Sequence, residues 1–111
     1  MKASEILRLS LSNLNNGDNW CQGKDMCDGN TMCCSSAAMS KIAVDKAGAQ
    51  VFECIRDIRR ARKYLLVSAG VKSEHYSILD LVKLNDVNGR TFPEIKAFFE
   101  QAIELAESKN D

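Results

Sequence analysis

The sequence predicts a mainly helical domain, with about five helices around one core and a small β-hairpin between the first and second helices. Two observations predict this fold. Apolar residues recur at helical spacing over five stretches, whereas the insert at about residues 20–33 lacks that spacing and contains a two-residue turn signal. A chain of 111 residues, 45% of them hydrophobic, is long enough to bury one core. We therefore expect residues 1–111 to form a single domain.

The first helix is predicted over about residues 4–15. At about 100° per residue, four apolar side chains share one stripe of this helix: Ala3, Leu7, Leu11 and Leu14. Residues 15–19 end it, because asparagine and glycine tolerate the left-handed backbone conformations that terminate helices.

The hairpin is predicted from the dipeptide Asp28-Gly29, which suits the two central positions of a tight type I′ turn. Residues 24–27 and 30–33 would pair across this turn. Because an isolated hairpin is only marginally stable in water, we expect it to lie on the helices. Trp20 is expected to anchor it to the core.

The second and third helices are predicted over residues 34–46 and 49–69. The second has a narrow stripe of small side chains, which permits close packing: Cys34, Ala38 and Ile42. The third is apolar on one face and basic on the opposite one, where four cations lie: Arg56, Arg59, Arg60 and Lys63. Gly70 follows as the predicted C-terminal cap.

Capping signals mark the last two helices. Ser77 and Asp80 fit a capping box that opens a short helix ending near residue 84. The last helix begins at Thr91-Phe92-Pro93-Glu94, where threonine can cap, proline suits the first turn and glutamate closes a second box. Its outer face is acidic, with Glu100, Glu104 and Glu107.

Composition narrows the function classes. The chain has 15 basic and 15 acidic residues, so its net charge of zero disfavours a dedicated binder of nucleic acid or anionic membranes. It contains no apolar run of the roughly 20 residues that a membrane span requires. Charged residues near the N-terminus interrupt any signal peptide, so a cytoplasmic location is expected. The five cysteines are then expected to be free thiols.

Four of these cysteines lie close together, with the spacing C-x5-C-x5-C-C. Structural zinc sites usually pair their ligands at C-x(2–4)-C spacing, so this pattern does not favour a metal. A ligand set of Cys21, Cys27, Cys33 or Cys34, plus His75, stays open, as does a redox disulfide between Cys33 and Cys34. Ordinary thiols are the favoured interpretation, and no metal or cofactor is predicted.

An enzymatic alternative rests on Cys34 and His75. Cys34 falls near a predicted helix start, where the helix dipole would stabilise a thiolate. His75 would act as the base, with Asp80 or Asn85 orienting it, in a hydrolase-like cysteine enzyme. Papain-like peptidases place the base on an antiparallel sheet, however, and this chain reads as helical after Cys34. A non-enzymatic role is therefore favoured.

The basic face of the third helix is the third candidate for function. It lacks interleaved aromatic residues, so a solvated face is favoured over contacts with nucleic-acid phosphates. The same face could pair with the acidic face of the last helix in a second chain. That pairing would give a homodimer, or a binding surface for another charged partner.

Three motifs resemble those of a bacterial family catalogued as a domain of unknown function. Trp20-Cys21-Gln22-Gly23 is similar to W-x-Q-G, and Cys34 with Ala37-Ala38-Met39 is similar to C-x-x-G-A-L. The stretch from Leu84 to Ile95 is similar to W-N-D-x-x-G-R-T-x-x-E-V. This sequence departs from the pattern at Leu84, which replaces a tryptophan, and at Ala37. The resemblance implies an origin on a phage or integron-cassette mobile element, and it implies no activity.

The motif residues lie at predicted element ends, so we expect them to converge where the hairpin meets the last turn: Trp20, Gln22, Gly23, Cys34, Asn85, Asp86, Arg90 and Thr91. In the structural interpretation, Asp86 pairs with Arg90 and holds the hairpin down. In the functional one, the cluster binds a small ligand or a protein segment. The sequence thus favours a non-enzymatic interaction or ligand-binding module.

Overall fold

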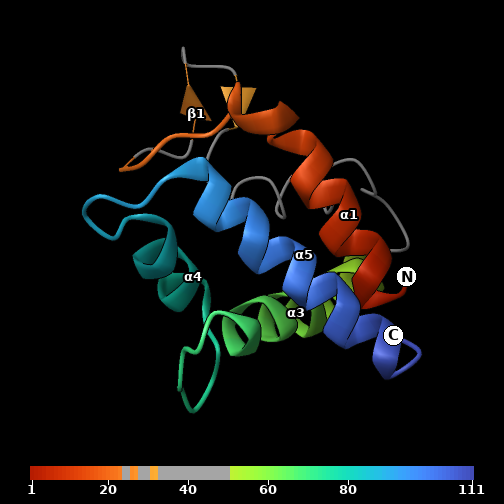
Figure 1. The fold of residues 1–111 in the computed structure, drawn as a ribbon. Coiled ribbons are helices and arrows are strands. Elements are labelled where there is room, and N and C mark those ends of the chain that lie inside the picture. Colours follow the sequence, from red (N-terminus) through yellow and green to blue (C-terminus); the bar gives the residue numbers. More distant parts are fainter. Residues whose placement is uncertain (24–25, 28–30, 33–50) are drawn as a thin grey trace.

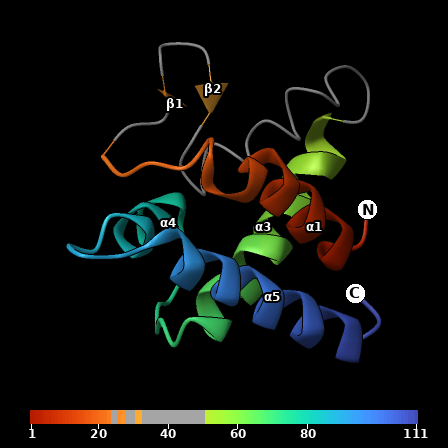
Figure 2. The same ribbon diagram turned by 45° about the horizontal axis from the view of Figure 1, so that its top comes forward.

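The computed structural model of the chain describes residues 1–23, 26–27, 31–32 and 51–111 (Figure 1). These residues are mainly helical, as predicted, and hold four α-helices: α1 (Ala3–Asn13), α3 (Val51–Ser68), α4 (Ile78–Asn85) and α5 (Phe92–Ser108). Helices α1, α3 and α5 pack against one another, and α4 packs on α3. The two ends of the chain lie side by side in both views (Figures 1 and 2).

One core joins the four helices. Phe99 of α5 is fully buried at its centre, together with Ile6 and Leu7 of α1 and Leu65 of α3. Leu81 and Leu84 bring the inner side of α4 to the same cluster. The apolar stripes predicted for the first, third and last helices therefore supply this core. None of the described helices is long and apolar enough to cross a membrane.

Between α1 and α3 the structure describes only short elements. A 3₁₀ turn, η1 (Asn15–Gly17), follows α1, and Asn15 and Asn16 have the positive φ angles expected of a helix stop, 48° and 54°. Strands β1 (Met26–Cys27) and β2 (Thr31–Met32) are antiparallel, with Met26 opposite Met32 and Cys27 opposite Thr31. The turn between them lies outside the described residues, so a hairpin of the predicted extent stays a prediction. The helix predicted over residues 34–46 also lies outside them, and the total of five helices stays a prediction with it.

The predicted caps are found in part. Gly70 ends α3 with φ of 80°, and its N–H donates to the carbonyl of Val67. Ser77 and Asp80 form the predicted capping box at the start of α4. Thr91 occupies the N-cap position of α5, but its side chain accepts no backbone N–H; its Oγ1 donates to Glu94 Oε1 instead, at 3.2 Å. The second capping box is therefore wrong in one respect, because the Thr91 side chain does not cap the helix.

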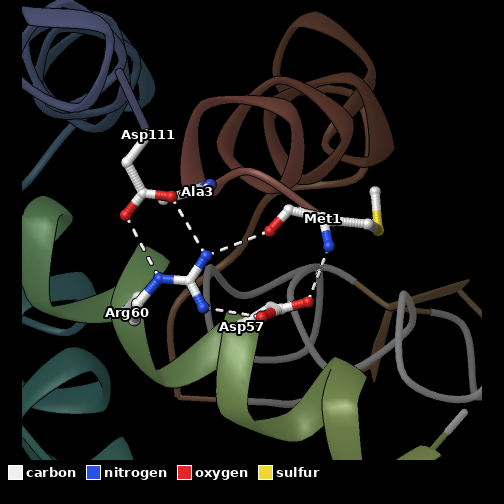
Figure 3. A network of polar contacts seen from close by, with 5 residues as sticks. All are labelled: Met1, Ala3, Asp57, Arg60 and Asp111. Carbon is white, nitrogen blue, oxygen red and sulfur yellow. Dashed lines mark hydrogen bonds and ion pairs between the residues drawn. The ribbon is translucent and has the colours of Figure 1, made fainter. Parts of the chain in front are cut away.

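Arg60 differs most from its predicted solvated position. Its guanidinium lies between two carboxylates, 2.6 Å from Asp57 Oδ1 and 3.0 Å from Asp111 Oδ1 (Figure 3). Asp57 also accepts from the Met1 ammonium at 2.7 Å, and Asp111 accepts from the N–H of Ala3 at the start of α1. We call these five residues the terminal network. They tie both ends of the chain to α3.

The terminal network shifts the pKa values of its members. Hydrogen bonds from Arg60, and then from the Ala3 N–H, lower the pKa of Asp111 from its ordinary 3.8 to about 2, against the opposing effect of burial. The Met1 ammonium lowers the pKa of Asp57 by hydrogen bonding, helped by Arg60. Hydrogen bonds to Asp111 and Asp57 raise the pKa of Arg60. Arg60 and its two carboxylate partners are therefore charged at neutral pH.

Candidate functional site

The motif residues around Trp20 meet the C-terminal end of α4. The indole Nε1 of Trp20 donates to Asn85 Oδ1 at 2.8 Å, and the Gly23 N–H donates to Asp86 Oδ1 at 3.0 Å. Gln22 Nε2 donates to the carbonyls of Asn85 and Val87, at 3.0 and 2.7 Å. We call Trp20, Gln22, Gly23, Asn85 and Asp86 the loop clasp. It joins two segments more than 60 positions apart in the sequence.

Asn85 is the centre of the loop clasp. It is fully buried, and its Nδ2 donates to the Cys21 carbonyl and to Asp86 Oδ1, both at 3.0 Å. Within the described residues, every buried side-chain nitrogen and oxygen atom has a hydrogen-bond partner. A buried amide with its donors and acceptor satisfied fixes one loop geometry, and losing its partners is costly. The clasp thus orders the structure, while a ligand-binding role for it stays a prediction.

Arg90 and Thr91 lie beside the clasp but pair elsewhere. Arg90 Nη1 lies 3.0 Å from Glu94 Oε2, its Nε donates to the Leu84 carbonyl, and its guanidinium stacks 5.0 Å from the centre of the Phe98 ring. The predicted pair between Asp86 and Arg90 is therefore wrong. A carboxylate one turn along α5 is a nearer partner for this arginine than one across the loop.

Aromatic packing holds the same corner together. The rings of Trp20 and Phe92 are 6.2 Å apart, at a tilt of 50°. Gly17 lies against Phe92 with φ of 98°, and a Cβ there would come within 2.9 Å of the ring. The close approach of η1 to α5 thus depends on this glycine. The contact between Trp20 and Phe92 supports the prediction that Trp20 is an anchor to the core.

The cysteine candidates are only partly described. Cys34 lies outside the described residues, so its pairing with His75 is not tested. Cys21 is disulfide-bonded, so the prediction of free thiols is wrong there, and its sulfur is not available as a thiolate ligand for the four-residue metal set. Cys54 is a free, buried thiol. No group of metal-ligating side chains occurs in the part of the chain that the structure describes.

His75 does not have the suggested orienting partners. Its side chain is 86% exposed, and its Nε2 lies 3.8 Å from Glu74 Oε2. Asp80 is occupied by Ser73 and Ser77 in the turn before α4, and Asn85 is in the loop clasp. Neither therefore orients the imidazole as a catalytic base requires.

A second polar region lies at the other end of α4 and includes Arg59, Arg60 and Lys63 of the predicted basic face of the third helix. An open groove of about 830 Å³ runs between α3 and the segment that leads into α4. We call it the α3 groove. It is lined by Ile55, Ile58, Arg59, Arg60, Arg62, Lys63, His75, Tyr76, Ser77, Ile78 and Leu79.

One wall of the α3 groove is an ordered turn. Tyr76 has φ of 48°, a strained angle for a non-glycine residue, and α3 holds it there. Arg62 Nε donates to the Tyr76 carbonyl at 2.8 Å, and Lys63 Nζ lies 5.7 Å from the centre of the Tyr76 ring. Ser73 Oγ donates to Asp80 Oδ2 at 2.7 Å, which closes the turn and lowers the pKa of Asp80. The groove is therefore preformed.

Three cations of the α3 groove have no ion pair with a described carboxylate. Arg59, Arg62 and Lys63 form no ion pair with any acidic residue that the structure describes, whereas the adjacent Arg60 has two. Burial lowers the pKa of Arg62, and the positive charge of Arg59 lowers it further, against the opposing effect of the negative charge of Asp80. Asp80 offsets part of the charge of Arg62, and no ion pair with a described residue offsets Arg59 or Lys63, so the groove keeps a positive potential.

Aliphatic side chains accompany these cations. Ile55 of α3 is 39% exposed, and Ile78 and Leu79 at the start of α4 are 53% and 68% exposed. Leu79 and Ile78 are the two most exposed large apolar side chains of the described residues. The sequence held one signal for them, because α4 has more apolar residues than the single face that Leu81 and Leu84 bury. A groove that is both cationic and aliphatic suits a partner with the opposite charge and its own apolar side chains.

Comparisons of the chain with protein-family models, curated proteins and solved structures found no match. The resemblance of its three motifs to a bacterial family therefore stays a prediction. Trp20, Gln22 and Gly23 of the first motif, and Asn85 and Asp86 of the third, have a structural explanation in the loop clasp.

Proposed function

We propose that this protein is a non-enzymatic interaction module that binds an anionic partner in the α3 groove. The observation that carries the proposal is the absence of carboxylate partners around Arg59, Arg62 and Lys63 among the described residues, next to exposed aliphatic side chains. Clustered cations repel one another, and Arg62 is in addition partly buried away from water. A carboxylate of the partner would offset the repulsion between the cations and would compensate the partly buried charge of Arg62.

The contrast with the terminal network supports the choice of the groove. At Arg60 the chain supplies two carboxylates of its own, so that cation contributes to folding. At Arg59, only one position away, the described residues supply none. Unpaired charges beside apolar surface are typical of binding sites, where the partner completes the electrostatics.

The test is the binding of fluorescein-labelled decaglutamate, followed by fluorescence anisotropy at low ionic strength. Arg59→Ser is expected to weaken binding by about fivefold to tenfold, because one close charge pair is lost. Arg56→Ser is the matched control, because Arg56 is an exposed arginine of the same helix that does not line the groove. It is expected to change binding less than about twofold. Equal losses in the two variants would show diffuse attraction to the whole helix and would contradict the proposal.

A further inference from the structure

We propose that the occupant of the α3 groove is an acidic amphipathic helix of another protein, with aliphatic and carboxylate side chains on the same face. This inference rests on the proposed function and adds the chemical class of the partner. It depends on three properties of the groove: its charge, its apolar rim and the secondary structure of its walls.

The charge of the groove requires carboxylates. Arg59 and Lys63 are one helical turn apart on α3, so they present two cations at a spacing of about 6 Å along the helix. Glutamates at positions i and i+4 of a partner helix repeat at the same spacing. Arg62 has its Nε bound to the Tyr76 carbonyl, which aims a fixed guanidinium at the same groove.

The rim of the groove requires aliphatic groups. Ile78 and Leu79 lie across from these cations, on the wall that Tyr76 and Ser77 complete. Neither side chain offers a hydrogen bond or a ring on which a base could stack. Single-stranded nucleic acids bind by aromatic stacking beside a cationic track, and Tyr76, the aromatic residue of this groove, is already covered by Lys63. Leucine-like side chains would bury Ile78 and Leu79, whereas phosphates would leave them in water.

The walls of the groove favour a helical occupant. An extended peptide gains affinity by pairing its backbone with the open edge of a sheet. Here one wall is α3, whose backbone groups are already bonded within the helix, and the other is the closed turn into α4. The lining from Ile55 to Lys63 extends over about 12 Å, which matches two turns of a partner helix. Recognition must then use side chains, as in the docking of an amphipathic helix into a groove.

A second copy of this chain could supply the carboxylates that the groove requires, but not the aliphatic side chains. The outer face of α5 supplies the exposed carboxylates Glu100 and Glu104. None of the exposed large apolar side chains of the described residues belongs to α5, however. A homodimer formed through this face would neutralise the cations and leave the aliphatic rim in water. We therefore assign the groove to a different protein.

The experiment uses three labelled helical peptides of about 16 residues, a length at which alanine-rich helices begin to form in water. The first carries glutamate and leucine on one face, the second has serine in place of leucine, and the third has lysine in place of glutamate. Anisotropy is measured against the unmodified chain, Leu79→Ser and Arg59→Ser. We expect the Glu/Leu peptide to bind at least about tenfold more tightly than either of the others. Leu79→Ser should reduce that preference to about threefold or less.

Each alternative gives a different result. Equal binding of the Glu/Leu and Glu/Ser peptides overturns the inference, and the proposed function survives if Arg59→Ser weakens both. Tighter binding of a single-stranded RNA, or of phosphatidylcholine vesicles containing phosphatidylserine, with the same dependence on Arg59, also overturns the inference alone. Sedimentation showing a dimer that Arg59→Ser and Glu104→Ser each dissociate assigns the groove to a second copy. If no probe responds to Arg59→Ser, both proposals fail.

Folding of the variants is checked separately. Leu79 is 68% exposed and Arg59 is exposed, so the urea midpoints of both variants should match that of the unmodified chain. Leu79→Ala is the second variant, because it keeps helix propensity while removing the branched side chain. It should reduce the preference for the Glu/Leu peptide in the same direction as Leu79→Ser. An unchanged preference in both folded variants overturns the inference.

Discussion

The two ends of α4 show opposite arrangements of polar and apolar groups. At the C-terminal end, Asn85 is fully buried, and the loop clasp satisfies its amide. At the N-terminal end, Ile78 and Leu79 are exposed, and the cations across the α3 groove lack carboxylate partners among the described residues. One end of a single eight-residue helix completes the fold, while the other is left open. The difference indicates where the chain uses its polar groups for folding and where they are free to bind.

The same contrast occurs between neighbours on α3. Both residues line the groove, but Arg60 is paired in the terminal network and holds both chain ends, whereas Arg59 has no ion pair with a described residue. A rotation of about 100° between adjacent helix positions separates the two roles. Removing Arg60 should therefore destabilise the fold. Removing Arg59 should weaken binding and leave the stability nearly unchanged.

The largest expected effect is at the clasp. Asn85→Ala should lower the free energy of unfolding by about 3 kcal/mol, because the Trp20 indole N–H and the Cys21 carbonyl lose their partner in a buried site. Asp86→Ala should cost less, about 1 kcal/mol, because Asp86 is exposed. Urea unfolding followed by circular dichroism measures both. A change below about 0.5 kcal/mol for Asn85→Ala would contradict the structural role of the clasp.

The next effect is at the terminal network. Arg60→Leu should destabilise the chain by about 1.5 kcal/mol, since two partly exposed ion pairs are lost and Asp111 is no longer held at the start of α1. Arg59→Leu on the same helix is the control, with an expected change within about 0.5 kcal/mol. Thermal and urea unfolding of the two variants test the contrast. Equal destabilisation would remove the distinction between the two arginines.

A smaller effect should appear in acid. The folded-state pKa of Asp111 is lowered to about 2, so its ion pair stabilises the fold above the ordinary value of 3.8. This contribution is lost as the pH falls from about 4 towards 2, and we expect about 1 kcal/mol after screening by solvent. Asp111→Asn should therefore lose less stability than the unmodified chain between about pH 5 and pH 2.5. If urea unfolding shows that the two proteins lose the same amount of stability over this pH range, the contribution assigned to Asp111 is contradicted.

The smallest effect on folding is expected at the groove. Ile78→Ser and Lys63→Ser should each change the free energy of unfolding by less than about 0.5 kcal/mol, because neither side chain is buried. Urea unfolding tests this directly. A loss above about 1.5 kcal/mol in either variant would show that the groove is part of the core and not an open surface.

Much of the fold could be predicted because its signals are local. The capping box at Ser77, the glycine after α3 and the apolar stripes of α1, α3 and α5 depend on residues within a few positions of one another. Local spacing does not encode the partners of Arg60, which include a residue 51 positions away. It also cannot choose between Asp86 and Glu94, which are both four positions from Arg90. These depend on how the helices pack.

The loop clasp and the α3 groove also show how far local sequence signals predict a site. The motif residues Trp20, Gln22, Gly23, Asn85 and Asp86 were singled out from the sequence, and the structure brings these five together. The sequence predicts only part of the α3 groove: it indicates the basic face with Arg59 and Lys63, which it favours as solvated, but not the second wall with Ile78 and Leu79. What distinguishes a binding cation from a solvated one is the absence of nearby carboxylates and the presence of exposed Ile78 and Leu79 across the groove. Both properties belong to the tertiary structure.

The most direct test of the account is a ¹H–¹⁵N correlation spectrum recorded while the Glu/Leu peptide is added. Trp20 is the single tryptophan of the chain, so its indole N–H gives one separate signal that reports on the loop clasp. We predict that the amide signals of Arg59, Lys63 and Leu79 shift while the indole signal stays in place. A shift of the indole signal, with the groove amides unchanged, would show that the clasp is the binding site and the groove is not.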